Sequence, residues 1–99
     1  MKDLFPDGFD IEFDPEDPLY IISVVSHMVD IPIWTLRKLD ELSIVSPKRL
    51  GKKTRCYSQK QIKILNYVHY LMEEKGVNIS GIKFILEVEH RRGADKKGG

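Results

Sequence analysis

Two short helices are predicted in the first half of the chain, separated by a brief turn at 30–32. The second is expected over 33–42, where apolar side chains recur at helical spacing: Ile33, Leu36, Leu39 and Leu42. The first is expected to begin after Ser23, whose hydroxyl can accept a hydrogen bond from a free amide of the first turn. Pro32 suits the first position of the second helix, where no amide donor is needed. This is a helix-turn-helix pattern, although many helical hairpins share it.

A basic β-hairpin is predicted over residues 44–57. β-favouring residues flank a stretch that contains Gly51, so the tip is expected near 51–54. Five of the eight positions from 48 to 55 are basic: Lys48, Arg49, Lys52, Lys53 and Arg55. These charges repel one another unless solvent or an anion screens them. Before the first helix, a short apolar run at 20–22 suits a small strand or a core anchor.

Two longer helices are predicted in the second half of the chain. One is expected over 59–74, capped by Ser58 and ended by Gly76, which tolerates the left-handed conformation that ends helices. The other is expected to run to about residue 90, with Asn78 or Ser80 as its cap. Residues 91–99 contain three glycines and predict a flexible tail. The predicted fold class is mainly α, a winged helix-turn-helix with four helices and a small β-hairpin wing.

The charges are divided unevenly along the chain, although the net charge is only +1. Residues 1–18 carry seven acidic side chains and one lysine, a net charge of −6, and the remainder carries +7. Repulsion among the acids, together with three prolines, predicts a disordered arm over 1–18. A domain is then expected over 19–90. A body with a charge of +7 suits a polyanionic partner, and the arm could compete with that partner for the wing.

Several classes of protein are disfavoured. The apolar runs fall short of the roughly 20 residues that a membrane span needs, and a secretory signal is not expected, so the cytoplasm is the default location. Cys56 is the only cysteine, and the three histidines are scattered, so neither a disulfide nor a metal site is expected. The sequence offers no phosphate loop and no nucleophile–base arrangement. We therefore expect neither enzymatic activity nor a cofactor.

Several short motifs occur in the order and spacing of a known family. They are Thr35-Leu36-Arg37, Asp40, Ile44-Val45-Ser46-Pro47, Arg49 and Thr54-Arg55-Cys56-Tyr57-Ser58. Together they resemble the signature of the MerR-type transcriptional regulators. The stretch 76–82 is similar to the loop that leads into that family's fourth helix, and the steps at 22–25 and 76–78 are closest to its heat-shock repressor (HspR-like) branch. The resemblance covers about residues 19–90.

The resemblance implies sequence-specific binding of double-stranded DNA in transcription regulation. Helix 33–42 would enter the major groove, and the wing, 45–57, would lie on the phosphate backbone. The expected contacts come from Ser23, Trp34, Thr35, Arg37, Lys38, Arg49, Lys52, Lys53, Arg55 and Tyr57. On helix 33–42 these side chains are expected to lie outside the apolar stripe. Other roles stay open for three of them: Ser23 as a simple cap, Trp34 as a buried anchor and Tyr57 as a core residue.

Three positions depart from the family pattern. Lys38 and Leu39 stand where two aromatic residues are usual, so an aromatic phosphate contact is in doubt and Lys38 could replace it ionically. Ser43 stands where glycine is usual, which questions the tightness of that turn.

Family members continue into a long dimerisation helix, so a longer parent protein is expected to be a homodimer and this chain a monomer. Two alternatives stay open: a protein-interaction module on a winged-helix fold, and an excisionase-like DNA-architectural protein.

Overall fold

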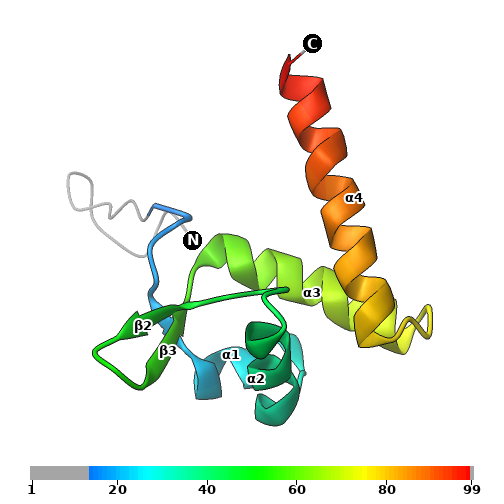
Figure 1. Ribbon diagram of the computed structural model, residues 1–99. Coiled ribbons are helices and arrows are strands. Elements are labelled where there is room, and N and C mark those ends of the chain that lie inside the picture. The colour runs from blue at the N-terminus through cyan, green and yellow to red at the C-terminus, as the bar shows by residue number, and fades with distance from the viewer. Residues whose placement is uncertain (1–13, 99) are drawn as a thin grey trace, which may run out of the picture.

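The computed structural model describes the backbone of residues 14–98 and the side chains of residues 14–92. The fold has four helices and a small sheet, and the sheet lies at one side of the helices (Figure 1). The elements in chain order are β1 (Tyr20–Ile21), α1 (Ile22–Val29), α2 (Ile33–Glu41), β2 (Lys48–Leu50), β3 (Thr54–Tyr57), α3 (Gln59–Glu73) and α4 (Ile79–Gly98). The predicted fold class, a mainly α winged helix-turn-helix, is confirmed. None of the described helices has the length and apolar character to cross a membrane.

The sheet is antiparallel, with β3 between β1 and β2. Arg49 lies opposite Arg55 in the wing, and Tyr20 lies opposite Tyr57 at its base. The wing strands are shorter than the predicted hairpin, which was expected to begin at residue 44. Instead, the amides of Ile44 and Val45 donate to the Leu39 carbonyl, at 2.8 and 3.3 Å. These amides satisfy the end of α2, so they do not take part in a strand ladder.

A single hydrophobic core joins the helices to the inner face of the sheet. Its fully buried members include Val25, Leu36, Leu39, Tyr57, Leu65, Val68 and Ile82. The apolar stripes predicted for α2 and α3 supply most of this set, because residues three and four apart lie on the same side of a helix. α2 and the wing are therefore held on a shared support, so the angle between them is set by packing.

The helix ends match the predicted caps at α3 and differ at α1 and α2. Ser58 forms a capping box with Gln61, whose amide donates to Ser58 Oγ at 3.1 Å while its side chain accepts from the Ser58 amide at 3.0 Å. α1 begins earlier than predicted, with Ile21 at the N-cap position and no side-chain cap, so Ser23 is not its cap. Pro32 is the N-cap of α2 rather than its first residue. Asp30, with a φ of 56°, ends α1 in the left-handed conformation.

α4 is longer than predicted. The Asn78 side chain accepts from the Gly81 amide at 2.9 Å, so Asn78 and not Ser80 caps its start. The helix then continues to Gly98, past the end near residue 90 that the sequence predicted, and the flexibility expected of 91–99 stays a prediction. A glycine inside a helix costs only about 1 kcal/mol, and Gly93 is preceded by two arginines, which are good helix formers. The outer half of α4 extends away from the other elements (Figure 1).

The end of the acidic arm is anchored beside the wing. Residues 14–17 form a turn in which the Asp17 amide donates to the Asp14 carbonyl. The Lys60 amide, in the first turn of α3, donates to the Pro15 carbonyl at 3.1 Å, and Lys60 Nζ lies 3.2 Å from Glu16 Oε1. Residues 14–17 thus contact α3, while residues 1–13 lie outside the described part of the chain, and the disorder expected of the arm stays a prediction.

Candidate nucleic-acid interface

The outer side of α2 presents polar and aromatic side chains to solvent. Trp34 is 72% exposed, and Arg37 and Lys38 are exposed one turn further along. Thr35 was expected beside them, but it is 3% exposed and faces the core. Residues at 35, 36 and 39 share one side of the helix, so Thr35 belongs to the buried stripe and its side chain is not available to DNA in this conformation.

The wing carries a concentration of positive charge around its tip. Lys48, Lys52 and Lys53 are exposed, and they form no ion pair with another described residue. Leu50 lies among them and is 69% exposed. Gly51 makes the sharp turn after β2, with a φ of +69° that side chains with a Cβ rarely adopt. We call the exposed residues Trp34, Arg37, Lys38, Arg49, Leu50, Lys52 and Lys53 the α2–wing face.

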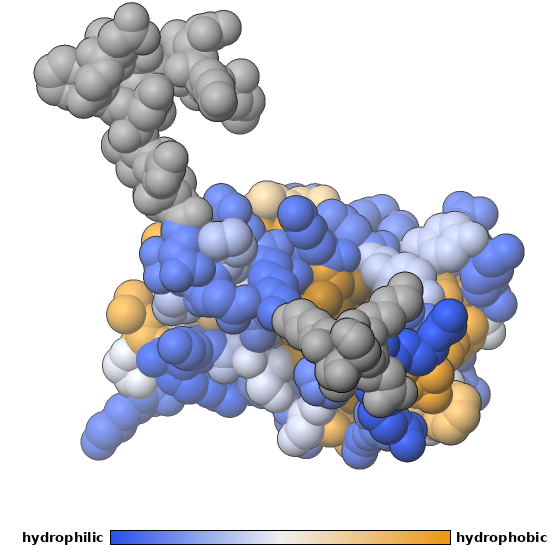
Figure 2. Space-filling model, turned by 90° about the horizontal axis from the view of Figure 1, so that it is seen from above, coloured by the Kyte–Doolittle hydropathy of each residue, from blue (hydrophilic) through white to orange (hydrophobic). Residues whose placement is uncertain are grey.

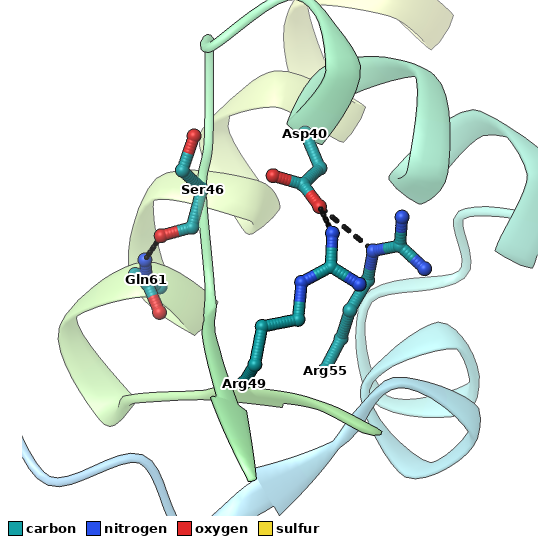
Figure 3. Close-up of polar contacts among 5 residues, drawn as sticks. All are labelled: Asp40, Ser46, Arg49, Arg55 and Gln61. Carbon is teal, nitrogen blue, oxygen red and sulfur yellow. Dashed lines mark hydrogen bonds and ion pairs between the residues drawn. The ribbon is translucent and has the colours of Figure 1, made fainter. Parts of the chain in front are cut away.

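Two wing arginines converge on one carboxylate of α2. Asp40 Oδ2 accepts from Arg55 Nε at 2.7 Å and from Arg49 Nη2 at 3.0 Å (Figure 3). The Asp40 and Arg55 side chains are 12% and 16% exposed, while that of Arg49 is 43% exposed. The mostly buried Asp40–Arg55 pair therefore fixes the wing to α2, and Arg49 is open to a second anion on its solvent side. We did not predict this role for Asp40, although its place in the quoted motif was a signal.

Tyr57 is fully buried, with no hydrogen-bond partner for its hydroxyl among the described residues. Burial raises its pKa to about 12, with a further contribution from the nearby Asp40 charge, which Arg55 and Arg49 partly offset. The expected phosphate contact from Tyr57 does not fit this geometry, and its alternative role as a core residue does. Arg55 was also expected to contact a phosphate, but its side chain is mostly buried and is already paired with Asp40.

Gln61 ties the start of α3 to the segment that enters the wing. Besides its part in the capping box, its side-chain nitrogen donates to the Ser46 carbonyl at 2.8 Å (Figure 3). The wing is thus fixed at both ends, by Asp40 on one side and by Gln61 on the other. Glutamine at the third helical position after serine is the sequence signal of the capping box. The second contact depends on the tertiary fold, and we did not predict it.

The opposite side of the molecule has a different character. A groove between α3, α4 and the end of α2 is lined by Ile44, Ile64, Tyr67 and Leu86, with charged residues of both signs around it. Seen from above, the surface shows apolar patches among mostly hydrophilic residues (Figure 2). The groove mixes cations with the acids Glu87 and Glu89, whereas the exposed charges of the wing tip are all positive. No metal-binding group of three or more His, Cys, Asp or Glu side chains occurs in the described structure.

Comparison with known proteins agrees with this geometry. The family model for MerR helix-turn-helix family regulatory proteins matches residues 20–89, which include every element from β1 to the first half of α4. The chain belongs to the MerR family. A Streptomyces coelicolor relative that carries the name heat shock protein HspR is 38% identical over 80 residues. That alignment covers 81% of this chain and 53% of the relative, so the chain spans about half the length of the curated relative it matches.

The departures from the MerR pattern have structural explanations. Leu39 occupies the place of a usual aromatic residue and is fully buried in the core, so its side chain packs and does not contact an anion. Ser43 occupies the place of a usual glycine and adopts a φ of 58°, so the turn is left-handed at this residue. Its amide donates to the Asp40 carbonyl at 2.9 Å. The turn after α2 is therefore left-handed in this chain although a side chain is present.

Proposed function

We propose that this chain is the duplex-DNA-binding part of a MerR-family transcription regulator. α2 would enter the major groove, which is wide enough for one helix, and the wing would follow the phosphate backbone. The observation that carries the proposal is the set of exposed cations on the α2–wing face that no acidic side chain of the described structure neutralises. Lysine and arginine on such a surface displace the counterions that condense on DNA.

The proposed contacts follow from exposure. Arg37 and Trp34 would read base edges or contact backbone at the start of α2, and Lys38 would contact a phosphate. Lys52 and Lys53 would add sequence-independent attraction from the wing tip. Ser23 is exposed in the first turn of α1, where free amides favour a phosphate. Arg49 would bind a phosphate on its exposed side, while Arg55 would act through Asp40 by holding the wing in place.

The test is binding of the whole chain to 30-bp duplexes selected from a random library, against an unrelated duplex, at about 50 and 200 mM salt. We expect affinity to fall steeply with salt. The Lys52→Ala, Lys53→Ala double variant should lower the slope of log affinity against log salt by about 2, equally for both duplexes. Arg37→Ala should cost about 1–3 kcal/mol on the selected duplex and less on the unrelated one.

The matched control is the Lys63→Ala, Lys83→Ala double variant, which removes the same charge from the groove side of the molecule. It should leave the salt slope nearly unchanged. Absence of binding at low salt, or binding that ignores salt, would reject the proposal in favour of a protein-interaction module. A slope lowered equally by both double variants would show that the α2–wing face is not the contact surface.

The proposal also covers any longer protein that contains this chain. HspR is the name of a relative about twice as long as the aligned region, and repression in a heat-shock response is the regulatory role we propose on that basis. We propose that the longer protein acts as a homodimer in the cytoplasm, since paired half-sites are the usual targets of helix-turn-helix domains. We assign it no enzymatic role. Sedimentation of the 99-residue chain should show a monomer, and sedimentation of the longer protein a dimer.

A further inference from the structure

The acidic N-terminal residues and the α2–wing face are complementary in two respects. Residues 1–13 carry four acidic side chains against one lysine, and they include apolar residues at short intervals: Leu4, Phe5, Phe9, Ile11 and Phe13. The α2–wing face combines exposed cations with two of the most exposed large apolar side chains, Trp34 and Leu50. Duplex DNA would engage the cations and Trp34, whereas an acidic and aromatic peptide would also give Leu50 an apolar partner.

The anchor of the arm places its end close to the wing. The Pro15 carbonyl accepts from the Lys60 amide, three residues beyond the end of β3 at Tyr57. From Tyr57 to Thr54, β3 rises only about 10 Å at about 3.4 Å per residue. Thirteen residues can span up to roughly 45 Å when extended. The wing tip and the exposed side of α2 are therefore within reach of residues 1–13.

We propose that residues 1–13 dock on the α2–wing face of their own chain, against Trp34 and Leu50, and so compete with duplex DNA. This inference rests on the proposed function, because the occupied surface is the proposed DNA contact. Since the two parts are covalently joined, the arm acts at an effective concentration that a free peptide would reach only in the millimolar range. Multivalent ions or high salt would weaken the arm and DNA alike, since both are held by charge.

The effect of the arm on DNA affinity depends on the fraction of time for which the arm is docked. DNA binds only the fraction of molecules whose face is free, so its apparent dissociation constant rises by the inverse of that fraction. An arm docked for about nine-tenths of the time weakens DNA binding about tenfold, which corresponds to about 1.4 kcal/mol. Such an arm would reduce non-specific binding and leave a tight operator site accessible.

The experiment uses the whole chain and three sets of substitutions. The first set neutralises the arm with Asp3→Asn, Asp7→Asn, Asp10→Asn and Glu12→Gln. The second, Phe5→Ser, Phe9→Ser and Phe13→Ser, removes the aromatic residues without changing charge. The charge-matched control substitutes glutamine for four exposed acids at the end of α3 and on α4: Glu73, Glu74, Glu87 and Glu89. Each protein is titrated with a selected 30-bp duplex at low salt, and the emission of Trp34, the only tryptophan, is recorded without DNA.

We expect the arm-neutral chain to bind the duplex about tenfold more tightly than the unaltered chain, and the control to gain less than about threefold. The aromatic variant should also bind more tightly. In both arm variants the Trp34 emission should move to longer wavelength without DNA, because the ring loses its cover and becomes more hydrated. Adding a peptide of residues 1–13 should restore the unaltered emission at millimolar concentration.

Equal gains from the arm-neutral chain and the control would overturn the inference, because net charge alone would then explain them. Unchanged Trp34 emission in both arm variants would also overturn it. That result is expected if the arm packs instead on the exposed apolar side chains of α1, Val24 and Met28. If no variant binds DNA but the emission shifts as expected, the proposed function fails and the docked arm stands. If DNA binds with the same affinity in all four proteins, the function stands and the docked arm fails.

Discussion

At the scale of single residues, Tyr57 matches the family motif but does not take the phosphate-binding role that the motif implied. Its hydroxyl is buried without a partner among the described residues, and an unsatisfied buried hydroxyl costs about 1–3 kcal/mol. We predict that Tyr57→Phe leaves the free energy of unfolding unchanged or raises it by up to about 1 kcal/mol, and that DNA affinity does not change. Urea unfolding and duplex titration measure the two effects. A tenfold loss of DNA affinity with unchanged stability would restore the phosphate contact that the sequence motif implied.

The raised pKa of Tyr57 gives a second prediction. The folded chain holds this proton up to a pH of about 12, while the unfolded chain releases it near 10, so the stabilisation is present below pH 10 and is lost as the pH rises toward 12. Between about pH 9 and pH 11 the loss is about 1.4 kcal/mol. Urea unfolding at the two pH values should show that the unaltered chain loses this much more stability than Tyr57→Phe does. An identical pH dependence in both proteins would contradict the prediction.

Ser43 holds a left-handed conformation that glycine adopts without penalty. Relative to serine, glycine removes a steric cost of about 1–2 kcal/mol there and adds backbone entropy to the unfolded chain. We predict that Ser43→Gly raises the free energy of unfolding by about 0.5–1 kcal/mol, as measured in urea. The matched control is Ser46→Gly, outside the left-handed region, which should lower stability. A loss of stability in Ser43→Gly would contradict the argument.

At the scale of elements, the clamp between α2 and the wing is the central feature. Asp40→Asn would leave Arg55 mostly buried without a counter-charge, so we predict a loss of about 2 kcal/mol in the free energy of unfolding. DNA affinity should also fall, by more than the loss of folded protein explains, because the wing loses its fixed angle to α2. The control Glu41→Gln removes the same charge from an exposed neighbour and should cost less than about 0.5 kcal/mol. Equal effects of the two variants would mean that the clamp contributes nothing.

The elements also differ in how well the sequence predicted them. The apolar stripes and the Ser58 capping box predicted α2 and α3 closely, because both signals are local. The start of α1 was predicted poorly, because the β1 pairing with β3 holds Ile21 in extended conformation without a side-chain cap. The end of α4 was missed because the three glycines of 91–99 were given more weight than the good helix formers between them.

At the scale of the whole molecule, one core joins the four helices to strands β1 and β3. Leu65 is fully buried near the middle of α3, and the core around it includes residues of α1, α2, α4 and the sheet. We predict that Leu65→Ala lowers the free energy of unfolding by about 2–5 kcal/mol, a large part of the stability of a small domain. The exposed neighbour Asn66 is the control, and Asn66→Ala should change stability by less than about 0.5 kcal/mol. Circular dichroism in urea checks both, and unfolding of α3 and the wing at different urea concentrations would contradict a shared core.

The sequence determined the helical periodicity, the order of elements, the position of the wing and the accumulation of positive charge on it. These features depend on residue type and spacing over a few residues, which the chain carries locally. Only the tertiary structure decided that Thr35 and Tyr57 are buried, that Asp40 holds two arginines, and that Pro15 is bonded beside the wing. Each of these depends on segments far apart in the chain meeting in space. The approach of a carboxylate to an arginine, or the burial of a hydroxyl, is set by the packing of the shared core.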